Sequence, residues 1–343
     1  MPRIVAPVQI GDVTPWLPDA LPTDPDDALA TVRTWPADLR PGAGATARLW
    51  SLLATLAAHD LAVARAVEPH LDAVAIREQA GLPAAADRTW GVFAAEGPGA
   101  RLEAVPEGGA DPGAPRPDRW RLTGVKPWCS LADRLDAALV TAHLPGGGRG
   151  LFAVDLRDAG VSLVDQPWAS RGLAEIPSTP VAFDDVPATP VGAPGWYLER
   201  PGFWWGGTGV AACWYGGAVA LARTLWRRAA TSDDRLVAMH LGAVDVALQD
   251  ARRALEEAAR VVDGEVDRVP GPVVAKRTRA TVARTCEDVL TRVGHALGPA
   301  PLALDAVHAK RVADLQVYVR QQHAERDDAS LGATLAGRDD APW

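Results

Sequence analysis

The spacing of apolar residues changes twice along this chain, and the change limits the folds open to it. Over residues 46–79, Leu and Ala recur every three or four positions, which predicts one or two helices. Over residues 90–197, short β-prone runs alternate with Gly and Pro, a pattern typical of an antiparallel sheet that closes into a barrel or sandwich. Beyond Pro201-Gly202 the helical spacing returns and persists.

The last part of the chain carries two long amphipathic stripes. The first consists of Leu241, Val244, Leu248, Ala251, Leu255 and Ala258, and the second of Val282, Cys286, Val289, Val293 and Leu297. Gly298-Pro299 ends the second helix, and Pro301 opens a third that we expect to run to about Ser330. The apolar, Gly- and Ala-rich residues 206–228 read as a buried helix, so four helices are expected here.

This order predicts an α+β protein with N-terminal helices, a central antiparallel β-barrel-like domain and a C-terminal four-helix bundle. We place the boundaries at residues 1–88, which include an irregular lead-in, 89–200 and 201–343. With 343 residues, 48% of them hydrophobic, the chain is long enough to bury more than one core.

Charge and cysteine usage exclude several classes of protein. The net charge of -8 and the pI near 5.4 provide no basic field for a nucleic acid. The three cysteines lie far apart in the sequence, and no signal-peptide pattern follows Met1, so a reducing cytoplasm is expected. Residues 206–225 include Arg223 and are too polar for a membrane span.

Common catalytic and metal-binding motifs are absent from the sequence. The seven histidines are dispersed, without HxH or HExxH, so no metal site is expected. There is no GxSxG elbow and no phosphate-binding P-loop. The stretch "GGTGVAAC" has some of the glycine spacing of a dinucleotide loop, but no strand precedes it, which argues against a Rossmann site.

Three stretches of the sequence resemble characteristic segments of one flavoprotein family and stand at the corresponding places along the chain. They are "WGVFAAEGPGARLEAV", "WRLTGVKPWCSLADRLDAALVTA" and "WASRGLAEIPSTPVAFDDVPATPVG". The chain resembles the acyl-CoA dehydrogenase family over about residues 45–330, most strongly in the middle third. The resemblance implies an oxidoreductase that oxidises an acyl thioester, with acyl-CoA as the expected form of substrate.

In that family FAD lies between the β-domain and the C-terminal bundle. Carried over, the flavin contacts fall on Trp128 and Ser130, which match the Trp-x-Thr motif, and on Phe93 and Ala95. A flat aromatic side chain shields one ring face, and a hydroxyl tunes the flavin by hydrogen bonding. Ala95 has no hydroxyl, so one contact of the family is missing. The alternative for Trp128 is a core-filling role, and for Ser130 a turn hydroxyl.

The chain departs from the family at its phosphate-binding arginine. The stretch "RRAATSDDRLVAMHLGAV" keeps Arg227, Arg228 and Arg235 but lacks the Phe-Gly that follows such an arginine. We assign Arg228 as the residue that reaches the FAD pyrophosphate of a neighbouring subunit, because a guanidinium fork suits a phosphate. A solvated arginine is the alternative.

The larger departure concerns the catalytic glutamate. Matching Asp314 to the family places Gln322 or His323 where the glutamate should stand, and an amide cannot accept a proton from an acyl α-carbon. The candidate bases are therefore His323, whose imidazole can accept a proton, and the carboxylate of Glu325.

Two alternatives to an acyl dehydrogenase stay open: a flavin-dependent monooxygenase on the same fold, and a non-catalytic subunit that completes a related enzyme. The resemblance further implies electron transfer flavoprotein as the electron acceptor. It also implies a dimer or tetramer built through the C-terminal bundle.

Overall fold

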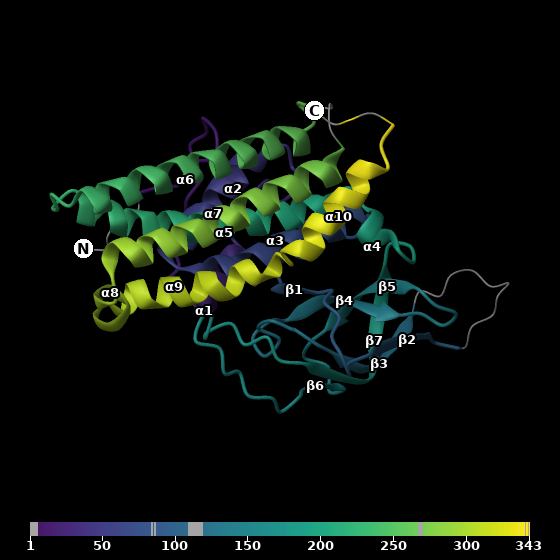
Figure 1. Cartoon of the computed structure of the whole chain (residues 1–343). Helices are drawn as coiled ribbons and strands as arrows, with labels where there is room; N and C mark the ends of the chain where they lie inside the picture. Colours follow the sequence, from purple (N-terminus) through teal and green to yellow (C-terminus); the bar gives the residue numbers. More distant parts are fainter. Residues whose placement is uncertain are drawn as a thin grey trace.

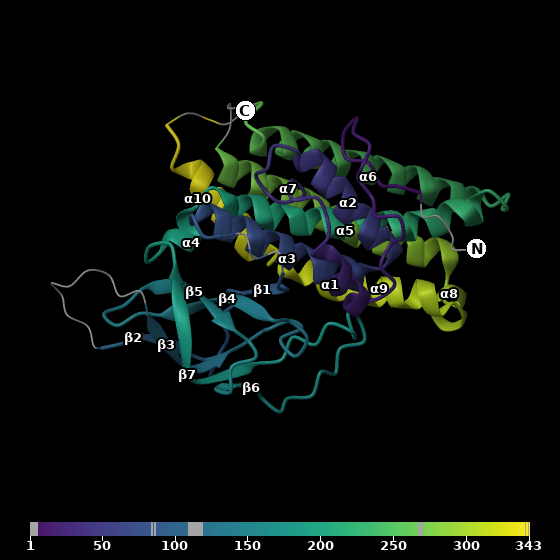
Figure 2. The ribbon, with the colours of Figure 1, turned by 180° about the vertical axis from the view of Figure 1, so that it is seen from behind.

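The protein consists of a helical body and a β-domain that lies against one side of it (Figures 1 and 2). The computed structural model describes residues 6–83, 85, 87–108, 119–266, 270–339, 341 and 343. The chain begins with α1 (Pro25–Val32), α2 (Thr46–His59) and α3 (Leu61–Gln79). Asp60 separates α2 from α3, and its carboxylate caps α3 by accepting a hydrogen bond from the backbone N of Ala62.

The β-domain forms a mixed sheet with barrel-like closure. Its strands are β1 (Trp90–Phe93), β2 (Leu102–Pro106), β3 (Trp120–Lys126), β4 (Ala137–His143), β5 (Arg149–Asp155), β6 (Val161–Leu163) and β7 (Val181–Val191). The path β4-β2-β3-β7-β5 returns to β4 through the β4–β5 pairing, so the sheet closes on itself. The predicted barrel-like domain is thereby confirmed.

Pairing in this domain is mostly antiparallel, but β1 and β2 each run parallel to β4. The glycine-rich connection between β4 and β5 forms a hairpin, with His143 opposite Arg149. Its glycines, Gly146, Gly147 and Gly148, all have positive φ, which side chains with a Cβ rarely adopt. The five residues of β2 include little β-branched content and carry only a weak strand signal in the sequence.

The C-terminal half begins with the short α4 (Trp196–Glu199) and three long helices: α5 (Gly202–Ala229), α6 (Arg235–Val262) and α7 (Gly271–Leu297). Helix α5 is the expected buried helix and packs against α2, α6, α7 and α9. The predicted stripes of α6 and α7 include several of the buried residues of these helices, such as Val244 and Val289, whereas Leu241, Leu248 and Leu297 are only half-buried. Among the described residues, no helix is long and apolar enough to cross a membrane.

The single helix predicted from Pro301 to about Ser330 is wrong. This segment instead forms α8 (Ala300–Leu304), α9 (Ala306–Tyr318), the 3-10 turn η1 (Val319–Gln321) and α10 (Glu325–Ala336). Asp305 starts α9 afresh by accepting hydrogen bonds from the backbone N of Val307 and His308. Ala324 adopts a positive φ of 46°, which interrupts the helix before α10. Both breaks follow from local backbone geometry rather than from the apolar spacing.

Candidate functional site

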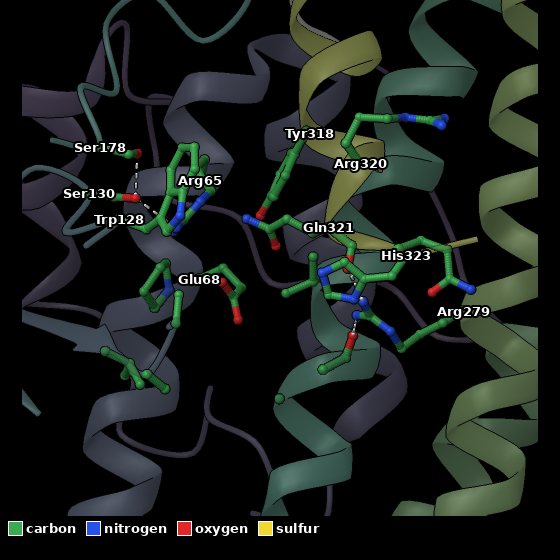
Figure 3. A pocket seen from close by; sticks show the side chains of 18 of the residues that line it. Arg65, Glu68, Trp128, Ser130, Ser178, Arg279, Tyr318, Arg320, Gln321 and His323 are labelled. Atoms are coloured by element: carbon green, nitrogen blue, oxygen red, sulfur yellow. Dashed lines mark hydrogen bonds between the residues drawn. The ribbon is translucent and has the colours of Figure 1, made fainter. Parts of the chain in front are cut away.

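A cavity of about 1020 Å³ lies between the β-domain and the helical body. Helix α3, the end of β1 and the turn after β3 line one side. The first turns of α5, the first third of α7 and the junction from α9 to α10 line the other. Figure 3 shows the side chains of this cavity, with Trp128 and Ser130 facing Tyr318, Gln321 and His323 across it. Its volume is in the upper range for ligand sites.

The turn after β3 presents an aromatic side chain to the cavity. Trp128 is 57% exposed and has a φ of 59°, which is unusual for a residue with a large side chain. Such a backbone conformation is held only when the surrounding structure fixes it, and it is common at ligand sites. Next to it, Lys126 is fully buried, and its Nζ donates hydrogen bonds to Glu96 at 2.8 Å and Thr141 at 2.9 Å. Lys126 therefore anchors the turn that carries Trp128.

Ser130 joins three parts of the structure at the cavity wall. Its Oγ lies 2.7 Å from Oγ of Ser178 and accepts a hydrogen bond from Nη2 of Arg65 at 3.0 Å. Arg65 belongs to α3, and Ser178 precedes β7. Two hydroxyls and a guanidinium thus meet beside the exposed indole of Trp128, within one wall of the cavity.

The opposite wall is formed where α9 gives way to α10. The buried amide of Gln322 has an Oε1 atom without a hydrogen-bond partner among the described residues. His323 has a 64% exposed side chain, and its Nδ1 lies 3.6 Å from Oδ1 of Asp327. Arg279 of α7 donates to the carbonyls of Gly207 and Gln321, the latter at 3.0 Å. Arg279 therefore ties the junction to α5.

Buried charges lie along the α3 side of the cavity. Asp72 pairs with Arg200 at 3.4 Å, and Arg200 also donates to Gln79 at 2.8 Å. Glu68 is 8% exposed, and burial raises the pKa of its carboxyl to about 8. Arg65 and Arg279 oppose that rise in pKa, whereas Asp72 adds to it. A carboxyl with a perturbed pKa in a cavity is a candidate for acid–base chemistry.

The structure brings some of the predicted site residues together and leaves others apart. Trp128, Ser130, Ala95 and His323 all line the cavity. Phe93 instead lies in the core and does not line the cavity, although its neighbours Val92 and Ala94 do.

Two predicted residues lie away from the cavity. Glu325 is exposed in the first turn of α10. Arg228 is exposed at the far end of α5, roughly 27 Å along the helix from Val210 at about 1.5 Å per residue. A role for Arg228 toward a neighbouring subunit stays a prediction.

The sequence interpretation did not single out Glu68, Arg65 or Arg279. The available signal was the spacing of Arg65, Glu68 and Asp72, which places three charged groups on one face of a helix that is otherwise rich in Ala and Val. Among the described residues there is no cluster of three or more His, Cys, Asp or Glu that could hold a metal ion.

Comparison with known proteins identifies the fold. No protein-family model matches the sequence, and no curated protein matches it either. The structure superposes on butyryl-CoA dehydrogenase from Megasphaera elsdenii with a TM-score of 0.76 and 15% identity, covering 91% of this chain and 89% of that one. The chain has the acyl-CoA dehydrogenase fold.

Other solved structures with this fold differ in what they bind. A complex of TdsC from Paenibacillus sp. A11-2 with FMN and indole gives a TM-score of 0.72 at 17% identity, covering 86% of this chain and 85% of that one. A complex of KijD3 with dTDP gives 0.72 at 17% identity, covering 91% and 87%. TdsC is also described as a dibenzothiophene monooxygenase. The acyl-CoA dehydrogenase fold therefore supports more than one reaction.

Proposed function

We propose that this protein is a flavin-dependent oxidoreductase that oxidises an acyl thioester. The observation that carries the proposal is the exposed indole of Trp128, held beside the hydroxyl of Ser130 on the wall of a cavity between the β-domain and the helical body. An aromatic face with adjacent hydrogen-bonding groups suits a planar heterocycle that carries polar edge atoms.

The residues of the cavity fit a flavin. Trp128 supplies an aromatic surface, and Ser130 and Ser178 supply hydroxyls. We propose that Trp128, Ser130 and the backbone around Ala95 and Phe93 hold the ring. A bound flavin supplies an acceptor for two electrons in the form of a hydride.

We propose FAD as the form of the flavin, because the fold resemblance implies it. Arg228 would then contact the pyrophosphate of the flavin in a neighbouring subunit, which requires an oligomer. Acid release of the bound cofactor and its chromatography against FAD and FMN standards tests this assignment. Recovery of FMN alone would contradict it and would leave Arg228 without a proposed ligand.

An acyl thioester is supported by the fold and by the shape of the site. The cavity is large enough for both a ring system and a substrate chain, and aliphatic and aromatic side chains such as Val210, Phe203 and Trp204 line it. In the reaction, the chain's own residues must take one proton from the substrate. His323 lies at the cavity and is a candidate for this step, whereas Glu325 lies outside it.

Flavin-dependent monooxygenation is the second candidate, and Gln322 favours it. The resemblance places Gln322 or His323 where a catalytic glutamate would stand, and the amide of Gln322 cannot accept the α-proton of an acyl group. The similarity in fold to TdsC supports the same candidate. Oxygen would then be the second substrate and a reductase the source of electrons.

Anaerobic addition of butyryl-CoA to the flavin-loaded protein separates the two reactions. Loss of the flavin's blue absorption, together with formation of the unsaturated thioester, is expected for the dehydrogenase, with electron transfer flavoprotein tested as the acceptor. No bleaching by a panel of acyl-CoAs, with oxygen consumed when reduced flavin is supplied, would replace the dehydrogenase with the monooxygenase. A chain that holds flavin only together with a homologous subunit would indicate a non-catalytic partner.

A cytoplasmic location stays the prediction from the cysteine pattern.

A further inference from the structure

Glu68 is a buried cavity residue to which the proposed function assigns no role. It lies in the middle of α3, one turn after Arg65, and its side chain lines the cavity. Figure 3 shows the carboxyl projecting from α3 into the space between Trp128 and the Gln321–His323 wall. Only 8% of Glu68 is exposed, so the carboxyl meets the cavity rather than bulk solvent.

The carboxyl of Glu68 forms neither a hydrogen bond nor an ion pair within the described part of the chain. The nearby cations are already engaged elsewhere. Arg65 donates to Ser130 and lies 5.8 Å from the Tyr318 ring centroid, while Arg279 donates to the carbonyls of Gly207 and Gln321. Burying a charged carboxylate without a close partner is unfavourable, so Glu68 holds a proton more tightly than an ordinary glutamate.

Asp72 shows that this arrangement is particular to Glu68. It lies one turn further along α3 and is also buried, but Arg200 donates to its carboxylate. Glu68 therefore differs from its helical neighbour in having a free carboxyl directed at the cavity. Among the described residues that line the cavity, Glu96 is paired with Lys126, and Asp327 accepts from the backbone N of His323.

We propose that Glu68, rather than His323 or Glu325, is the catalytic residue that accepts the substrate proton in this cavity. This inference rests on the proposed function. The α C–H bond of the acyl group breaks, its proton forms an O–H bond with the Glu68 carboxylate, and the electron pair stays on the substrate. A flavin held beside Trp128 and Ser130 would supply the two-electron acceptor for the hydride that leaves the β-carbon, and the electron pair left on the α-carbon would form the new double bond. The products are an unsaturated thioester, reduced flavin and neutral Glu68.

Its surroundings suit Glu68 to this role better than those of the other candidates. His323 is 64% exposed at its side chain and is held by Asp327, and Glu325 is outside the cavity. Proton transfer from carbon is most efficient when the pKa of the base lies near the working pH, and burial raises the pKa of Glu68 to about 8.

Because the base must be ionised, proton removal should increase as the pH rises through this pKa. The groups that act on Glu68 are Arg65 and Asp72 of α3 and Arg279 of α7. Three further groups face it, namely Tyr197 of α4, Cys213 of α5 and Tyr318 of α9.

Two measurements test the proposal. The first is a carbon-13 NMR titration of protein labelled at the glutamate carboxyl carbon, in which Glu68 is the signal missing from Glu68→Gln. The second is exchange of the α-protons of butyryl-CoA with deuterated solvent, catalysed by the flavin-loaded protein. Glu68→Asp is the conservative variant, and Glu257→Gln, an exposed position on α6, is the matched control.

We expect the Glu68 signal to titrate well above pH 6. Exchange should fall about 10²- to 10⁴-fold in Glu68→Gln, recover in part in Glu68→Asp and stay at the wild-type rate in Glu257→Gln. Flavin content should be unchanged in all three variants.

Two results would overturn the assignment: wild-type exchange in Glu68→Gln, or a Glu68 signal that titrates near pH 4.5. A wild-type protein that retains flavin but does not exchange the α-protons of acyl-CoA would instead refute the acyl thioester as substrate. The NMR titration of the Glu68 carboxyl would then be the remaining test of its raised pKa.

Discussion

Arg65 of α3 donates a hydrogen bond from Nη2 to Oγ of Ser130 at 3.0 Å, and this contact joins the N-terminal helices to the β-domain at the cavity wall. Ser130 also lies 2.7 Å from Ser178, so its hydroxyl is held in one orientation beside Trp128. A hydroxyl fixed in this way costs little further ordering when a ligand binds.

Replacing Ser130 with Ala should therefore weaken flavin binding. The loss of one neutral hydrogen bond is worth about 1 kcal/mol, or roughly a five- to tenfold higher Kd. Fluorescence titration with FAD measures the change. Ser162→Ala, an exposed position on β6, should bind FAD as the wild type does. Equal affinities in all three proteins would show that Ser130 does not contact the flavin.

The buried imidazole of His70 should make stability depend on pH. Burial lowers its pKa to about 4 from the usual 6.5, and its Nδ1 accepts a hydrogen bond from the backbone N of Trp90 at 3.2 Å. Between these two pH values the unfolded chain binds a proton that the folded protein does not. Stability is therefore lost as the pH falls through this window, by at most about 1.4 kcal/mol per pH unit.

Urea denaturation at pH 7, 6 and 5 measures this loss. In His70→Asn the free energy of unfolding should be lower at pH 7 but should fall less steeply toward pH 5. His295→Asn, at an exposed position of α7, should keep the wild-type slope. Equal slopes for wild type and His70→Asn would mean that His70 is not buried in its neutral form.

Glycines in the long helices should respond to substitution in opposite ways. A Cβ on Gly216 of α5 would lie 2.1 Å from the carbonyl O of Ala54, where α5 packs against α2. Gly216→Ala should therefore destabilise the protein by at least about 1–3 kcal/mol. Gly242 of α6 has nothing within 4 Å of that position, so Gly242→Ala should stabilise it by about 0.5–1 kcal/mol. Thermal unfolding compares the two, and a stabilised Gly216→Ala would contradict the close α2–α5 packing.

The fold could be predicted further from the sequence than the site could. The stripes that contain Val244 and Val289 predict α6 and α7, because apolar residues that recur every three or four positions lie on one face of a helix and are buried together. The break before α10 could not be predicted, since Ala324 is an unusual residue for a positive φ. The parallel pairing of β1 with β4 joins segments far apart in the sequence, such as Trp90 and Ala137, and leaves no local mark.

The site depends on contacts between residues distant in the sequence, and these limited its prediction. Trp128 and Ser130 were found through their match to a family motif. Glu68 was missed because a glutamate three residues after an arginine is typical of an exposed helical ion pair. Its character depends instead on burial and on Arg65 being bonded to Ser130, which only the folded chain shows.

The most direct test of the central claim is the visible absorption spectrum of the purified protein before and after incubation with FAD and gel filtration. We expect flavin bands in the near-ultraviolet and blue that stay with the protein peak and are weakened in Trp128→Ala. A protein peak that remains colourless after incubation with FAD, and likewise with FMN, would contradict the assignment of this cavity as a flavin site.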